Sequence, residues 1–225
     1  MLLFDDSNTI GQPTFIPSAD IVSTIIDLTL KAWSHVCQRA DIHVGCDEPT
    51  IAGALYQELW IEKERRNIHG PPLILDEAAA RSSRRVLLPE GWIDFKLQYD
   101  WGEESYFGME CKRISSTDKN LAREYVAEGV MRFVSGKYSP GHAIAAMIGF
   151  IIDGNMVGCI RLIREKILQT HTKIRMDGDW SAETNYTSYQ HIYRTRHRQH
   201  GHSSLITILH LFLNISDAEQ QLLDL

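Results

Sequence analysis

Two stretches of alternating polar and apolar residues, joined by a short turn, constrain the fold of this chain most. From residue 92 to 99 the apolar side chains fall on odd-numbered positions, and the polar ones fall on the even-numbered positions after Trp92. Residues 105–114 alternate with the same parity, and the turn between the two stretches contains Gly102. Because the side chains of a strand point alternately to its two faces, this pattern predicts an antiparallel hairpin with one apolar and one polar face.

The register of this hairpin brings charged residues together. If the turn is centred on its glycine, Asp94 lies opposite Glu110, with Cβ atoms about 5 Å apart. Lys112 follows Glu110 by two residues and therefore projects from the same face. The same register places Lys96 opposite Gly108. A slip of one residue would turn these charges into the core, so the alternation supports this register.

Two acids and an amine on one face of a sheet form a candidate catalytic site. Neighbouring carboxylates repel each other unless a cation lies between them, and oxygen ligands with room for water favour an ion such as Mg²⁺. We expect Asp94 and Glu110 to bind this ion, with the backbone carbonyl of Cys111 as a further ligand. The ion polarises a phosphoryl oxygen, while Lys112 can orient the attacking water or stabilise the transition state. The arrangement predicts phosphodiester hydrolysis; the alternative is an exposed ladder of salt bridges, each worth about 0.2–1 kcal/mol.

These residues resemble a known family. Asp94, followed on the next strand by Glu110-Cys111-Lys112, resembles the D…(D/E)xK signature of the PD-(D/E)xK nucleases, which are restriction-endonuclease-like phosphodiesterases. The predicted order of helices and strands over residues 48–152 resembles the αβββαβ core of that family. The resemblance implies cleavage of nucleic acid, usually DNA, with Mg²⁺ as the cofactor and Mn²⁺ as its substitute. It also implies that Asp94 and Glu110 are metal ligands and that Lys112 is the catalytic lysine.

Members of this family often carry a further acidic residue on the first core helix. Glu58 is our candidate for that additional metal ligand, with Glu62 one turn later as the rival. The alternative is that Glu58 is an ordinary polar position of the helix. The chain departs from the family pattern at Ile93, which precedes Asp94 where many members have proline.

A second acid-x-lysine pattern begins at Asp94 itself and ends at Lys96. In that assignment Asp76 or Glu77 would provide the first metal ligand. We favour the assignment with Lys112, because a helix is predicted after Lys112 and none is predicted after Lys96.

The remaining patterns predict one α/β domain, an α+β sandwich in which helices cover a sheet. Helices are predicted over 19–39, 48–67, 118–135 and 153–169, and strands over 83–88, 91–99, 105–114, 142–152, 186–199 and 204–215. The restriction-endonuclease-like core spans about residues 48–152. An N-terminal helical extension over 1–47 precedes this core, and a C-terminal helix with a basic hairpin over 153–225 follows it.

The distribution of charge singles out the C-terminal third of the chain. The net charge is −6, which argues against a general coat for nucleic acid. Residues 154–202 nevertheless hold eight Lys and Arg against four Asp and Glu, so a polyanion binds most favourably there. Arg194, Arg196 and Arg198 alternate along one predicted strand and are candidate phosphate contacts. The alternative is a hairpin that is solvated or binds a partner.

Three further residues each have a structural and a functional interpretation. His142 begins the predicted buried strand, and we favour a core position over a contact with substrate. Arg132 and Lys137 lie late in the helix predicted over 118–135 and beyond it. They can contact phosphate, or they can simply face solvent.

Other features exclude whole classes of protein. The four cysteines lie far apart, with no CxxC or zinc-like spacing, which predicts free thiols in a cytoplasmic protein. The longest apolar run, residues 143–152, is too short to cross a bilayer, and the N-terminus shows no secretory signal. We therefore expect no membrane partner.

Nucleic acid, with DNA favoured, is the expected partner. A compact nuclease without its own recognition domain is expected to act with a partner protein subunit or as a homo-oligomer. Analogy with the family suggests an antiphage defence or restriction system. The overall acidity supports a second hypothesis, a non-catalytic nucleic-acid-binding or assembly subunit that retains the nuclease fold.

Overall fold

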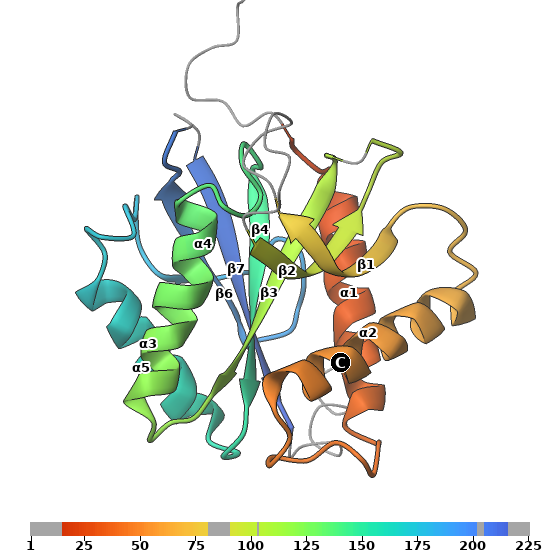
Figure 1. Ribbon diagram of the computed structural model, residues 1–225, viewed down its shortest axis with the longest axis horizontal. Coiled ribbons are helices and arrows are strands. Elements are labelled where there is room, and N and C mark those ends of the chain that lie inside the picture. Colours follow the sequence, from red (N-terminus) through yellow and green to blue (C-terminus); the bar gives the residue numbers. More distant parts are fainter. Residues whose placement is uncertain (1–14, 81–90, 103, 202–204, 216–225) are drawn as a thin grey trace, which may run out of the picture.

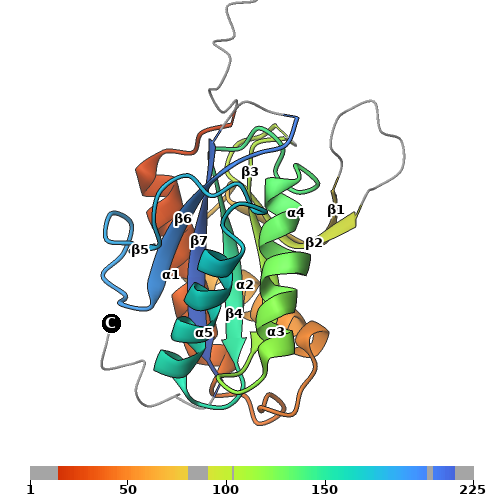
Figure 2. The same cartoon turned by 90° about the vertical axis from the view of Figure 1, so that its left-hand side faces the viewer.

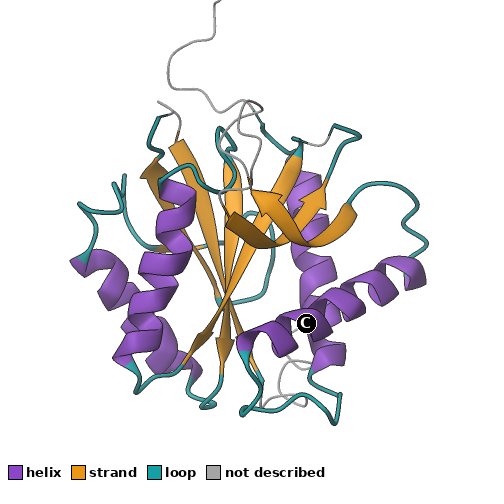
Figure 3. Cartoon of the chain, viewed as in Figure 1, coloured by secondary structure: helices purple, strands orange, loops and turns teal. Residues whose placement is uncertain are grey.

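A mixed seven-stranded sheet forms the centre of the molecule, with helices on both faces (Figures 1 and 3). The computed structural model describes residues 15–80, 91–102, 104–201 and 205–215. The strands run in the order β1-β2-β3-β4-β7-β6-β5 across the sheet. Their bounds are Leu73–Ala80 (β1), Gly91–Gln98 (β2), Tyr106–Ile114 (β3), Ile144–Ile151 (β4), Ser181–Ala182 (β5), Ile192–Arg198 (β6) and Leu205–Asn214 (β7). Strands β3, β4 and β7 are parallel to one another, and the other neighbouring pairs are antiparallel.

Two layers of helices cover the sheet. The elements are α1 (Ala19–Val36), α2 (Glu48–Arg65), α3 (Lys119–Glu124), the π-helical turn η1 (Tyr125–Val130), α4 (Met131–Val134) and α5 (Met156–Gln169). Helices α1 and α2 share one apolar cluster with one face of the sheet, and α3, η1, α4 and α5 share another cluster with the opposite face. Figure 2, a view turned by 90°, shows α1 and α4 on opposite sides of the strands. The predicted α/β class, with helices covering a sheet, is confirmed.

The predicted hairpin is confirmed in position, and its register is confirmed from Phe95 to Gln98. Lys96 pairs with Gly108 and Phe95 pairs with Met109. The helices and the strand β4 also fall within the predicted ranges. The strand predicted over 83–88 lies outside the described residues, and the structure pairs residues 73–80 with β2 as the first strand of the sheet.

The described residues on both sides of the segment 48–152 belong to the same sheet and core. Strand β7 lies between β4 and β6 and runs parallel to β4, so the predicted C-terminal hairpin extends the central sheet. In α1, Trp33 stacks on Phe150 with ring centroids 5.2 Å apart, and its indole Nε1 donates to the carbonyl oxygen of Asn214 at 3.2 Å. One apolar cluster therefore contains residues from both sides of the segment 48–152.

A chain of buried polar side chains links the second helical layer to the sheet. The hydroxyl of Tyr125 lies 3.0 Å from Nδ1 of His210, whose Nε2 lies 2.8 Å from the hydroxyl of Thr195. The same Thr195 hydroxyl lies 2.7 Å from Nε2 of His197. Nδ1 of His197 lies 2.8 Å from the carbonyl oxygen of Ile174. All four side chains are fully buried, so their polar atoms depend on one another instead of on water.

The structure bears on the cysteines and on membrane-spanning helices. Among the described residues, no disulfide joins Cys37, Cys46, Cys111 or Cys159. Among the residues that the structure describes, no helix combines the length and the apolar character needed to span a membrane.

Candidate active site

The predicted acids meet at a fork where β2 and β3 separate. The pairing of the two strands ends at Phe95 and Met109. One residue further, Oδ2 of Asp94 accepts the backbone N–H of Cys111 at 2.6 Å. Burial raises the pKa of the Asp94 carboxyl, and the hydrogen bond from Cys111 opposes that rise. Ile93 packs in the apolar cluster on one side of the sheet, and Phe95 packs in the cluster on the other side. The single apolar face predicted from the alternation therefore does not continue past Asp94.

Glu110 is the most buried acid of the site, with 1% of its surface exposed. Its Oε1 accepts hydrogen bonds from Nζ of Lys112 at 3.1 Å and from Nη1 of Arg132 at 3.0 Å. Its Oε2 is buried and has no hydrogen-bond partner among the described residues. Burial and the neighbouring Asp94 raise the pKa of Glu110 to about 7, against the attraction of the two cations. The second oxygen of this acid is therefore available to a proton or to a cation, and a cation competes with the proton at neutral pH.

Lys112 connects three acceptors at the fork. Its Nζ donates to Oε1 of Glu48 at 2.7 Å, to Oε1 of Glu110 at 3.1 Å and to the carbonyl oxygen of Cys111 at 2.7 Å. Burial lowers the pKa of Lys112, but the carboxylates of Glu110 and Glu48 outweigh this and raise the pKa above its usual value. The amine is therefore a permanent cation at neutral pH.

Glu48 is a member of this site that the sequence analysis missed. It is the first residue of α2, and its Oε2 also accepts the backbone N–H of Arg113 at 2.9 Å. The helix cap is provided by Asp47, whose Oδ1 accepts the N–H of Thr50 at 2.9 Å. The sequence feature that could have indicated Glu48 is the pair of acids before Pro49. Asp47 caps the helix, so the side chain of Glu48 is available to contact the fork.

The prediction that Glu58 completes the metal site is wrong, because α2 places this acid away from the fork. Glu58 lies ten residues beyond Glu48 on the same helix, about 15 Å along its axis. Its Oε1 pairs with Nη1 of Arg39 at 3.5 Å. The rival, Glu62, accepts a hydrogen bond from Arg66 at 2.8 Å. Both acids therefore support the packing of α2 against neighbouring segments instead of reaching Lys112.

Arg132 reaches into the site, although 28% of its side chain stays exposed. Its Nη1 donates to Glu110 and also to the hydroxyl of Tyr138 at 2.6 Å. That hydroxyl in turn donates to the carbonyl oxygen of Trp92 at 2.6 Å. Burial lowers the pKa of Arg132, and the nearby Glu110 outweighs this and raises it. Arg132 is therefore partly exposed and contacts a predicted metal ligand, and its contact with phosphate stays a prediction.

The alternative lysine lies elsewhere on the hairpin. Nζ of Lys96 lies over the ring of Tyr106, 4.7 Å from its centroid. Nζ of Lys112 lies within hydrogen-bond distance of Glu110. The side chains of Asp76 and Glu77, the first ligands of the alternative assignment, lie outside the described residues.

The donor atoms at the fork suit a hard divalent cation. Among the described residues, no three His, Cys, Asp or Glu side chains converge as a metal site. The available donors are therefore the carboxylates of Asp94 and Glu110 and the carbonyl of Cys111, which can accept a second interaction besides that with Lys112. Oxygen donors of this kind fit Mg²⁺ or Mn²⁺. The observation that supports this fit is Oε2 of Glu110, which is buried and has no hydrogen-bond partner in the described ranges of the chain.

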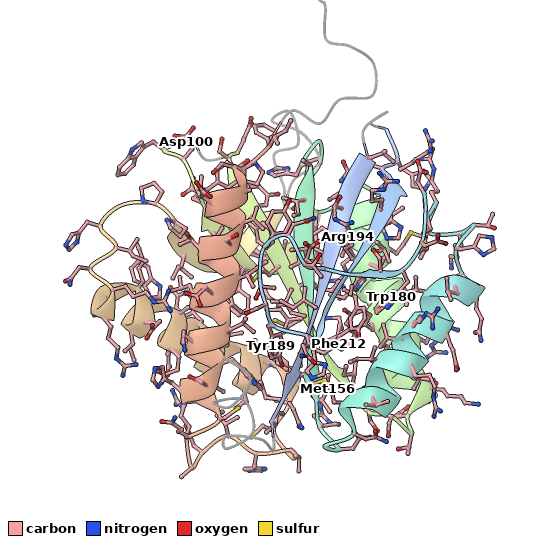
Figure 4. All side chains as sticks on the ribbon, turned by 180° about the vertical axis from the view of Figure 1, so that it is seen from behind. Asp100, Met156, Trp180, Tyr189, Arg194 and Phe212 are labelled. Atoms are coloured by element: carbon pink, nitrogen blue, oxygen red, sulfur yellow. The ribbon has the colours of Figure 1, made fainter. Side chains whose placement is uncertain are left out.

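The arginines of the basic strand lie apart from the fork. They belong to β6, which is separated from β3 by β4 and β7, or about 14 Å at the usual strand spacing. Arg194, visible beside β6 and β7 in Figure 4, pairs with Glu183 at 3.4 Å, and Arg198 pairs with Asp177 at 2.9 Å. These ion pairs weaken the attraction of the strand for phosphate.

His142 occupies a core position, as favoured from the sequence. It is 1% exposed, and its Nδ1 and Nε2 lie 3.1 Å and 2.9 Å from the carbonyl oxygens of Pro140 and Glu104. The rings of Phe15 and Tyr106 pack against it. The histidine therefore holds the start of β4 in place and does not contact the acids of the fork.

Comparison with known proteins adds no relative. No family model, no curated protein and no solved structure matches this chain. The geometry of the fork is therefore the basis on which a function can be argued.

Proposed function

We propose that this protein is a metal-dependent nuclease of the PD-(D/E)xK type, with a restriction-endonuclease-like core, that hydrolyses phosphodiester bonds, with DNA as the favoured substrate. One observation carries the proposal: Asp94, Glu110 and Lys112 meet at a fork between two strands, and one oxygen of Glu110 is buried without a hydrogen-bond partner among the described residues. A purely structural ion pair would satisfy that oxygen, because an unpaired buried acceptor is costly.

The residues of the fork would have two roles, metal binding and donation of hydrogen bonds to the substrate. Asp94, Glu110 and the carbonyl of Cys111 would hold Mg²⁺, with Mn²⁺ as its substitute. When bound, such an ion polarises a phosphoryl oxygen and lowers the pKa of a bound water. Lys112 is held as a cation by two carboxylates. It therefore donates hydrogen bonds, orienting the attacking water or stabilising charge on the phosphoryl group, and it is not a general base.

Glu48 positions this lysine. Its two oxygens bridge Nζ of Lys112 and the backbone N–H of Arg113, which ties the start of α2 to β3. The amine therefore cannot rotate away from the fork without losing its hydrogen bond to Glu48 together with those to Glu110 and Cys111.

Cleavage assays test the proposal directly. Plasmid DNA, linear duplex, single-stranded DNA and RNA are incubated with the purified protein in Mg²⁺ and in EDTA. We expect Mg²⁺-dependent cleavage that falls at least about a hundredfold in Asp94→Asn, Glu110→Gln and Lys112→Met, as is typical for groups that stabilise a transition state. Glu58→Gln is the matched control, because this acid lies outside the fork, and it should cleave at the wild-type rate. Undiminished cleavage by Glu110→Gln would remove the assignment.

One observation favours a second candidate, a non-catalytic nucleic-acid-binding or assembly subunit. Lys112 and Arg132 already balance much of the charge on Glu110, so the network can exist without a metal. Thermal unfolding with and without Mg²⁺ distinguishes the two functions. A nuclease site should be stabilised by the ion, by about 2.7 kcal/mol at one hundred times its Kd, whereas a structural network should be indifferent to it.

The biological setting belongs to the same proposal. A cytoplasmic location, a partner subunit or homo-oligomer, and a role in antiphage defence or restriction follow by analogy with nucleases of this type. They are tested by co-purification of the chain from its own cells and by challenge of those cells with phage.

A further inference from the structure

The two oxygens of Glu110 have different surroundings. Oε1 receives two cationic donors, Lys112 at 3.1 Å and Arg132 at 3.0 Å. Oε2 is buried and has no hydrogen-bond partner in the described part of the chain. The carboxylate therefore presents one satisfied and one available oxygen.

Arg132 is anchored on the opposite side of the fork. Its Nη1 donates to the hydroxyl of Tyr138 at 2.6 Å, and that hydroxyl donates to the carbonyl oxygen of Trp92 in β2 at 2.6 Å. The guanidinium carbon also lies 5.4 Å from the centroid of the Tyr138 ring. Trp92 precedes Asp94 by two residues, so the contacts connect one acid-bearing strand to the carboxylate of the other.

The helix that carries Arg132 approaches the sheet closely at this point. A Cβ atom on Gly129 would lie 3.8 Å from Cγ of Lys112 and 2.3 Å from Cε of Met147, so the glycine allows the close approach. Gly129 lies within the π-helical turn η1, directly before the segment with Arg132. Such turns are frequent at functional sites, because the extra residue changes the direction of the side chains that follow.

We infer that Arg132 is a positioning residue that occupies one side of Glu110, so that the fork binds a single divalent cation. The ion is held by Asp94 and by the free oxygen of Glu110. A second ion is excluded, because it would need Oε1 from the side that the guanidinium of Arg132 occupies at 3.0 Å, and like charges repel strongly at a buried site. This inference rests on the proposed function, since it concerns the metal of that site.

Counting bound Mn²⁺ tests the inference without measuring cleavage. Titration of the full-length protein, followed by calorimetry and by the electron paramagnetic resonance of free Mn²⁺, should give one ion per wild-type chain. Arg132→Met removes the positive charge and retains an unbranched, shorter side chain, and it should bind two. Arg123→Met is the matched control, an exposed arginine of α3 on the same helical stretch, and it should bind one.

The possible results separate the two proposals. Two ions on the wild-type chain, or one ion on Arg132→Met, would overturn the role of Arg132 while leaving a metal-dependent nuclease in place. No ion on any variant would remove the proposed function itself. Arg132→Gln is titrated in parallel, because it removes the charge and retains a polar side chain if the methionine variant does not fold. Two ions on that variant would support the inference, and one ion would overturn it.

Discussion

Replacing Thr195 by valine should expose how strongly one buried hydroxyl stabilises this fold. The carbonyl of Ile174 can only accept a hydrogen bond, so Nδ1 of His197 must be the donor and Nε2 the acceptor. The hydroxyl of Thr195 therefore donates to His197 and accepts from Nε2 of His210. Nδ1 of His210 is then left to accept from Tyr125. The carbonyl of Ile174 therefore fixes the direction of every hydrogen bond in this buried network.

The size of the effect follows from the two nitrogens that lose their partner. Valine has nearly the shape of threonine, so little cavity forms, but a donor on His210 and an acceptor on His197 become unsatisfied. Each such buried group costs about 1–3 kcal/mol, and we expect a loss of about 3 kcal/mol in the free energy of unfolding. For a chain of this length, that loss lowers Tm by about 6–12 °C.

Urea denaturation at pH 7.5 measures this loss as a lower midpoint with an unchanged slope. Thr195→Ser is the control, because it retains the hydroxyl and removes one methyl group, at a cost of about 1 kcal/mol. A loss below about 1 kcal/mol in Thr195→Val, or equal losses in the two variants, would refute the hydrogen-bond order derived above.

Two further predictions concern pH and salt. Burial lowers the pKa of His197 to about 4, below its usual 6.5, so the unfolded chain binds more protons between these values and stability falls as the pH falls below 6.5. Between pH 7 and pH 5 the wild type should lose about 2 kcal/mol more than His197→Gln in urea unfolding, and parallel profiles would contradict this. On β6, Arg196→Ala should reduce the salt slope of DNA binding by about 1. Arg198→Ala should reduce it less, because Asp177 already pairs with Arg198; equal slopes would speak against a phosphate contact at Arg196.

The sequence predicts the hairpin and its acids well because their signal is local. Alternation of polar and apolar residues fixes which face each side chain takes, and the short turn fixes the register, so Asp94, Glu110 and Lys112 could be brought together from spacing alone. The position of β7 beside β4 could not be predicted in this way. Parallel neighbours are joined by long connections, and nothing in either strand specifies the other.

The two residues that complete the fork show the same limit. Glu48 and Glu58 lie on one helix, and the choice between them depends on which end of that helix faces the sheet. Arg132 follows the π-helical turn η1, which changes the direction of the side chains after it. A regular helical repeat therefore predicts the wrong direction for the Arg132 side chain. In both cases the missing information is the packing of a helix on a sheet, which spacing along the chain does not contain.

The charges at the fork are compatible with the proposal that this acidic protein acts on a polyanion. Asp94, Glu110 and Glu48 face Lys112 and Arg132, and each of these groups shifts the pKa of others in the set. When all five are ionised, one negative charge remains. A single divalent cation would convert this into one positive charge, which matches the charge of one phosphodiester. The net charge of −6 is therefore no obstacle to the proposed function, because the local charge at the fork, and not the total, acts on a phosphate held there.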